Sequence, residues 1–237
     1  MPVRWDTVTV DGKPMRVYMG VPEGQPRRVG ILVAQHGPGV DGFIQDVVNR
    51  LFRRGYVAAA PELFHRQPPD VKDMPTRIGM LKDDEIIADM NATLAHMKGL
   101  KEVSVGPIGI VGFCMGGRVS YLMATASSEL KACAVFYGGN MFKQWGSLPT
   151  PFDRTKDIHC PVIGFYGNED TNPSPDDVNR IDAELTRLGK PHEFHRYNGA
   201  GHAFQNFLDA TRYRERPARG SWSEMLAFFR QYLRTAA

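Results

Sequence analysis

Cysteine is scarce in this chain, and its three cysteines, Cys114, Cys133 and Cys160, follow no CxxC spacing. Such a sparse, odd set argues against a disulfide framework and against a structural zinc site. The sequence has no HExxH motif or other paired ligand spacing either, so we expect no metal. At least one of the three cysteines is therefore expected to be a free thiol.

Long apolar runs and charge of one sign are also missing. No stretch approaches the roughly 20 apolar residues of a membrane-spanning helix. Residues 1–6 lack the apolar block of a secretory signal, so we expect a cytoplasmic protein without a membrane partner. The formal net charge is only +3, and lysine and arginine form no long runs. This pattern does not support a nucleic-acid partner.

The apolar residues that are present, 42% of 237, suffice for a sizeable core. Strand and helix signals alternate, which predicts a single α/β domain over residues 1–237 with a mostly parallel central sheet and helices on both faces. A hairpin is expected over 6–21, turning at Asp11-Gly12. The further strands are expected at 30–35, 57–60, 107–112, 132–137, 162–167 and 192–197. The helices are expected at 41–54, 83–98, 115–127, 176–188 and 222–233, with 62–82 and 138–158 irregular and forming the pocket.

The segment "GIVGFCMGG" over 109–117 follows the pattern glycine, any residue, nucleophile, any residue, glycine. This is the strand-to-helix elbow of α/β hydrolases. The elbow brings strand and helix too close for a Cβ at Gly112 or Gly116, and it projects the Cys114 side chain above the sheet. The free N–H groups at the start of the helix favour a thiolate at this point. Cys133 and Cys160 begin apolar strands and are expected to be buried small side chains.

A nucleophile of this kind needs a base and a residue that orients the base. In α/β hydrolases the acid follows the nucleophile along the chain and the histidine comes last. Asp170 follows the strand 162–167, with Glu169 as the alternative. His202 lies in the loop "GAGHAF", which we expect to be flexible enough to swing the imidazole toward Cys114.

Acyl transfer also requires hydrogen-bond donors for the oxyanion. One is expected to be the backbone N–H of Met115, directly after the nucleophile. The other should come from the loop after strand 30–35, where Pro38 has no N–H. We therefore assign the second donor to Gly37.

With these residues placed, the chain resembles the dienelactone hydrolase (carboxymethylenebutenolidase) family of α/β hydrolases from about residue 14 to 233. The resemblance is carried by Val33-Ala34-Gln35, Gly39-Val40, Gly55–Ala58, Pro61-Glu62-Leu63, Gly109–Gly117, Asp170 and Gly201–Phe204. The elbow cysteine is its specific part, because most α/β hydrolases use serine. The resemblance implies a Cys114, Asp170 and His202 triad that hydrolyses an ester or lactone through a thioester, without cofactor or metal.

Two positions depart from the family pattern. His36 stands where the family commonly has a glutamate, and Asn206 stands where the dienelactone enzymes have an arginine for the substrate carboxylate. His36 either acts on the thiol or packs away from it as part of the oxyanion loop. Other basic residues could meet an acidic substrate, namely Arg66, Lys72, Arg77 and Arg118.

The sequence thus predicts a hydrolase whose partner is a small-molecule ester or lactone. A thioesterase, a peptidase or another carboxylesterase could use the same site, and a non-catalytic binding protein could retain the fold. The natural substrate and the choice between monomer and homodimer stay open.

Overall fold

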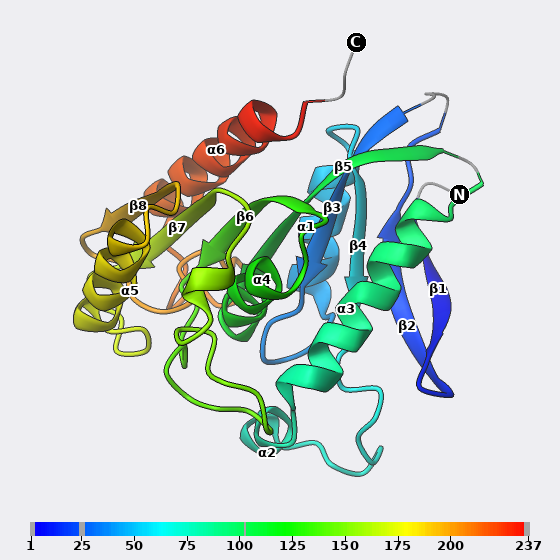
Figure 1. Cartoon of the computed structure of the whole chain (residues 1–237), viewed down its shortest axis with the longest axis horizontal. Coiled ribbons are helices and arrows are strands. Elements are labelled where there is room, and N and C mark those ends of the chain that lie inside the picture. The colour runs from blue at the N-terminus through cyan, green and yellow to red at the C-terminus, as the bar shows by residue number, and fades with distance from the viewer. Residues whose placement is uncertain (1–2, 24–26, 102, 235–237) are drawn as a thin grey trace.

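The computed structural model describes residues 3–23, 27–101 and 103–234. A single eight-stranded sheet runs through them in the order β1-β2-β4-β3-β5-β6-β7-β8 (Figure 1). Strands β3 to β8 are parallel, whereas β2 pairs antiparallel with both β1 and β4. The strands are β1 Val3–Val10, β2 Lys13–Gly20, β3 Arg27–Ala34, β4 Val57–Pro61, β5 Ser104–Phe113, β6 Leu130–Phe136, β7 Val162–Gly167 and β8 His192–Tyr197. The predicted mostly parallel α/β sheet is confirmed.

Helices cover both faces of the sheet (Figure 1). Helices α1 (Gly42–Phe52) and α6 (Glu215–Tyr232) bury their apolar residues in one core cluster. Helices α3 (Asp83–Lys98), α4 (Met115–Ala126) and α5 (Pro175–Arg187) contribute to the cluster on the other face. No helix among the described residues is long and apolar enough to cross a bilayer.

Two helical segments differ from the expectations. A short helix, α2 (Met74–Gly79), lies within the stretch expected to be irregular, and Asp73 caps it by accepting the Thr76 N–H. Helix α6 begins at Glu215 rather than at Trp222. Pro217 does not prevent this earlier start, because it lies in the first turn of the helix, where its missing N–H breaks no hydrogen bond. A single 3₁₀ turn, Thr155–Asp157, interrupts the other irregular stretch.

The close crossing of β5 and α4 explains the two elbow glycines. A Cβ placed on Gly112 would lie 1.9 Å from the Gly116 carbonyl oxygen. A Cβ placed on Gly116 would lie 2.3 Å from the Ala34 carbonyl oxygen of β3. Both contacts are to backbone atoms, so neither can be relieved by turning a side chain.

Replacing Gly112 with alanine should therefore lower the free energy of unfolding by about 3 kcal/mol or more, at the upper end of overpacking effects. Gly220 is the control, because it lies within α6 and an added Cβ meets nothing within 4 Å. Gly220→Ala should raise the free energy of unfolding by about 0.5–1 kcal/mol through helix propensity. Urea titration followed by circular dichroism measures both, and equal effects would contradict the crossing argument.

Candidate active site

The Cys114 thiol stands on a strained backbone between β5 and α4. Its φ of 56° and ψ of −121° lie in a region that side chains other than glycine rarely occupy. The Cys114 N–H donates to the Phe136 carbonyl of β6 at 3.0 Å, and its carbonyl accepts from the Gly117 N–H at 2.9 Å. These bonds fix the residue at the start of α4, where the helix presents its free N–H groups.

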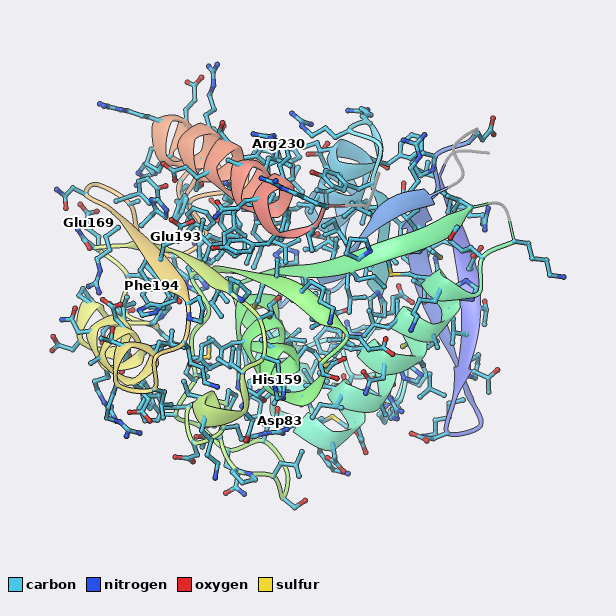
Figure 2. The ribbon with its side chains drawn as sticks, turned by 45° about the horizontal axis from the view of Figure 1, so that its top comes forward. Asp83, His159, Glu169, Glu193, Phe194 and Arg230 are labelled. Carbon is cyan, nitrogen blue, oxygen red and sulfur yellow. The ribbon has the colours of Figure 1, made fainter. Side chains whose placement is uncertain are left out.

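His202 and Asp170 are already paired beside this thiol. His202 Nδ1 lies 2.9 Å from Asp170 Oδ2, and the Asp170 side chain is 1% exposed. The other carboxylate oxygen, Oδ1, accepts the Asn172 N–H at 2.9 Å. Glu169, the alternative acid, is exposed and lies at the periphery of the molecule (Figure 2). The structure thus brings together Asp170, not Glu169, with the histidine.

Three groups lower the pKa of the Cys114 thiol by their interactions with the sulfur. They are the side chain of His202 and the backbone N–H groups of Met115 and Gly37. Burial alone would raise the pKa of the thiol, but these interactions, with the imidazolium charge among them, outweigh burial and bring that pKa below its usual value.

The same contacts act in the opposite direction on the histidine. Burial lowers the pKa of His202, but the hydrogen bonds and charges of Asp170 and Cys114 raise it overall. The two shifts together favour a thiolate beside an imidazolium in the resting site. The N–H groups of Gly37 and Met115, which are the two donors expected for an oxyanion, are therefore close to the Cys114 sulfur.

The loop that carries His202 is held in place rather than free to swing. Glu169 N–H donates to the Ala200 carbonyl at 3.0 Å, and Arg214 N–H donates to the Phe204 carbonyl at 3.0 Å. Phe204 is fully buried. The imidazole is therefore set against Cys114 without the movement expected from the glycine-rich sequence.

Tyr137 is a neighbour of His202 that the sequence argument missed. It directly follows β6, and its ring packs edge-on against the imidazole with 5.2 Å between centroids. Burial raises the pKa of Tyr137 well above its usual value, so the phenol stays neutral. The rule that active-site residues follow the ends of parallel strands could have found it.

His36 packs away from the thiol as part of the oxyanion loop. Its Nε2 lies 2.8 Å from Asp41 Oδ1, and its ring meets the Phe43 ring with 5.3 Å between centroids. Burial raises the pKa of Asp41, but the contact with His36 and the N–H groups at the start of α1 bring it below its usual value. Of the two alternatives for His36, these contacts favour the structural one.

Arg118 is a correction to the expected substrate contacts. Its side chain is completely buried and donates to Asp83 at 2.5 and 3.0 Å, and also to the Asn140 and Lys143 carbonyls. The guanidinium also stacks over Trp145 at 3.8 Å. Asp83 begins α3 (Figure 2), so Arg118 joins α3 and α4 to the loop over residues 140–145. It is a structural residue with no face open to a substrate.

Arg66 is the second correction. It pairs with the buried Asp89 and, at 2.7 Å, with Asp11 in the hairpin turn, and its side chain is 11% exposed. Because these two carboxylates already pair with the guanidinium, Arg66 is not available to bind the carboxylate of a substrate. Arg66 instead ties the turn of the N-terminal hairpin to α3.

The remaining two candidate cations are Lys72 and Arg77, and only Arg77 is shown beside the oxyanion loop. Lys72 is exposed in the stretch before α2. Arg77, on α2, stacks over Phe64 at 4.0 Å. It lines a small cavity of about 220 Å³ together with Gln35, Gly39 and neighbouring residues.

A larger cavity, of about 450 Å³, borders His202 on the side of Asp170. Asn206, at the position of the family arginine, turns back to cap its own loop, and its Oδ1 accepts the Leu208 N–H at 3.1 Å. The cations of this cavity come instead from Arg212 and Arg214. The guanidinium of Arg214 donates to three backbone carbonyls, whereas Arg212 is exposed and lies 3.3 Å from Asp209.

A strand-to-helix elbow, a buried carboxylate after β7 and a histidine after β8 define the α/β-hydrolase class of proteins. The model of the Dienelactone hydrolase family matches residues 15–233, and the chain belongs to this family. It is 34% identical over 224 residues to a Methylorubrum extorquens protein named "Putative carboxymethylenebutenolidase", covering 91% of this chain and 76% of that one.

A Synechocystis protein of the same name is 31% identical and covers 98% of both chains. Among solved structures, a Klebsiella pneumoniae protein described as "Putative Dienelactone Hydrolase" superposes with a TM-score of 0.90 at 30% identity. It covers 97% of this chain and 98% of its own. The chain is therefore a hydrolase of the carboxymethylenebutenolidase type in family and fold.

The buried Arg118–Asp83 pair generates a stability prediction. Arg118→Ala should lower the free energy of unfolding by about 3–5 kcal/mol, because it leaves a buried carboxylate unpaired. The double variant Arg118→Met with Asp83→Leu should recover most of that loss. The exposed Arg187–Glu184 pair on α5 is the control, and Arg187→Ala should leave the melting temperature unchanged. A loss below about 1 kcal/mol for Arg118→Ala would contradict the structural role.

Reaction with iodoacetamide as a function of pH tests the electrostatics of the thiol. Cys114 should react with a midpoint below the value of about 8.5 for an ordinary thiol. His202→Ala should raise this midpoint, because it removes the imidazolium, whereas His36→Ala should overlap the wild type. Peptide mapping should place the label on Cys114 alone, because burial raises the pKa of Cys160 to about 12 and also raises the pKa of Cys133 well above its usual value. A shift in His36→Ala as large as in His202→Ala would show that His36 acts on the thiol.

Proposed function

We propose that this protein hydrolyses a lactone or activated ester through a thioester on Cys114. The observation that supports the proposal is the position of Cys114 on the strained elbow beside the paired His202 and Asp170, where His202, Met115 and Gly37 lower the pKa of the thiol. A buried structural thiol has no need of these partners, and Cys133 in the same molecule donates only to a backbone carbonyl, that of Ser120. The family membership of the chain supports the same class of reaction.

The first half of the reaction forms the thioester. The Cys114 thiolate attacks the carbonyl carbon, and the carbonyl π pair moves to oxygen. The N–H groups of Gly37 and Met115 hold this oxyanion. When the carbonyl re-forms, the bond to the leaving oxygen breaks, and the His202 imidazolium gives its proton to that oxygen.

The second half releases the acid. Neutral His202 takes a proton from water, and the resulting hydroxide attacks the thioester carbonyl in the same oxyanion site. The C–S bond breaks, and the thiolate and imidazolium of the resting site are restored. Asp170, fixed by the Asn172 N–H, keeps Nδ1 protonated so that Nε2 faces the reacting atoms.

A cysteine suits this reaction when the leaving group is good. The thiolate is an intrinsically strong nucleophile that is already ionised, so attack needs no proton transfer. Expulsion of the leaving group then competes with loss of the thiolate from the tetrahedral intermediate. An enol lactone or an aryl ester meets this requirement better than a simple alkyl ester.

The test is turnover of a panel of p-nitrophenyl esters and enol lactones by wild type and three variants. Cys114→Ala should abolish hydrolysis, whereas Cys133→Ala is expected to keep it. His202→Ala should lower kcat by about 10³-fold or more. Intact-protein mass spectrometry during turnover should show an acyl group on Cys114. Binding of these compounds without any turnover would instead support a non-catalytic binding protein, and hydrolysis that survives in Cys114→Ala would refute the thioester.

A further inference from the structure

The order of the strands gives the site two different sides. Gly37 follows β3, Cys114 follows β5 and His202 follows β8, so Gly37 and His202 flank the thiol from opposite directions. In the proposed reaction the leaving oxygen must face His202 to receive its proton. The acyl group is then directed away from His202, past the oxyanion loop.

Helix α2 covers this second side with apolar side chains. A Cβ placed on Gly37 would lie 2.8 Å from Met74 Sδ and 3.3 Å from Ile78 Cδ1. Both side chains therefore rest directly on the residue that donates one of the oxyanion hydrogen bonds. Glycine at position 37 is what allows α2 to approach so closely.

Met74 contributes little to the core for so large an apolar residue. Helix α2 has no buried residue, and the Met74 side chain is 44% exposed, whereas Ile78 is half-buried against the core. The helix is held at its ends instead, by the Asp73 cap and by Arg77 on Phe64. An exposed methionine that rests on Gly37 is a surface that adapts to apolar ligands.

The side next to His202 is polar by contrast. The cavity of about 450 Å³ is lined by hydrogen-bonding groups, among them Thr171, Asn172, Thr211 and Arg212. This cavity meets His202 on the side of Asp170, and Cys114 is not among its lining residues. The apolar side chains over Gly37 and the polar groups around His202 thus lie on different sides of the site.

We propose that Met74 and Ile78 form an acyl subsite that selects substrates with an apolar acyl group. This inference rests on the proposed function, since it concerns the acyl group carried by Cys114. It assigns the polar part of the substrate to the leaving side, beside His202. It also gives α2, the helix absent from the sequence-based expectations, a role in specificity.

Esters with one leaving group and different acyl chains test the subsite. The wild type should hydrolyse p-nitrophenyl hexanoate with a kcat/KM at least about tenfold above that of p-nitrophenyl acetate, since each fully buried methylene contributes about fourfold. Met74→Ala should reduce this hexanoate-to-acetate ratio about five- to tenfold, and Met74→Leu should keep it within about twofold, because leucine retains the apolar volume. Met80→Ala is the matched control. Met80 has nearly the same exposure, 41%, at the other end of α2, and its replacement should leave the ratio unchanged.

An ester whose acyl chain has the same length but carries a charge tests the opposite preference. The mono-p-nitrophenyl ester of adipate carries a carboxylate where hexanoate has a methyl group, and it should be hydrolysed less efficiently than hexanoate. A preference for the adipate ester, or a ratio that does not respond to Met74→Ala, would overturn the subsite while turnover still depends on Cys114. Turnover that is absent, or that persists in Cys114→Ala, would overturn the proposed function and the subsite with it.

Discussion

The close crossing of β5 and α4 is the constraint on which the site depends. Gly112 and Gly116 permit backbone contacts that no side chain could accommodate, and Cys114 between them is held at a φ of 56°. A backbone of this kind costs about 1–3 kcal/mol, and it persists because the surrounding strands and helix leave no alternative. This backbone conformation places the Cys114 thiol both above the sheet and at the start of helix α4.

The parallel sheet then brings the other groups of the candidate site to the same edge. Each of β3, β6, β7 and β8 ends at the same edge as β5, so the residues that follow them come together there, with Tyr137 and Asp170 against His202. Their hydrogen bonds favour charge separation between sulfur and imidazole, and burial opposes it. The charge state of the resting thiol and imidazole is the outcome of that competition, and a thiolate is the state that the proposed attack on a carbonyl requires.

The sequence could predict the groups whose position follows from strand ends. Cys114, His202 and Asp170 were proposed in this way, because the elbow spacing and the order along the chain leave few alternatives, and the structure pairs His202 with Asp170. Arg66 and Arg118 were offered as substrate contacts only because they are basic, and a charge in the sequence does not reveal its partner. Asp11 and Asp83 lie 55 and 35 residues away from these arginines, and only the fold brings them together.

Helix α2 was missed for a different reason. It has six residues, too few for a periodic apolar pattern, and its signals are only an aspartate cap followed by Met74 and a proline. Tertiary packing over Gly37 decides its position. Short segments between the strands vary more than the strand ends do, so prediction from sequence is better for the groups at the strand ends than for the surroundings that would select a substrate.

The central claim is that Cys114 attacks with its oxyanion held by two particular backbone N–H groups. A crystal structure of the protein soaked with a slowly hydrolysed aryl ester or enol lactone tests this claim most directly. We expect the acyl group on Cys114 Sγ, with its carbonyl oxygen within hydrogen-bonding distance of the Gly37 and Met115 nitrogens. An acyl group on another residue, or a carbonyl oxygen directed away from both N–H groups, would contradict the account.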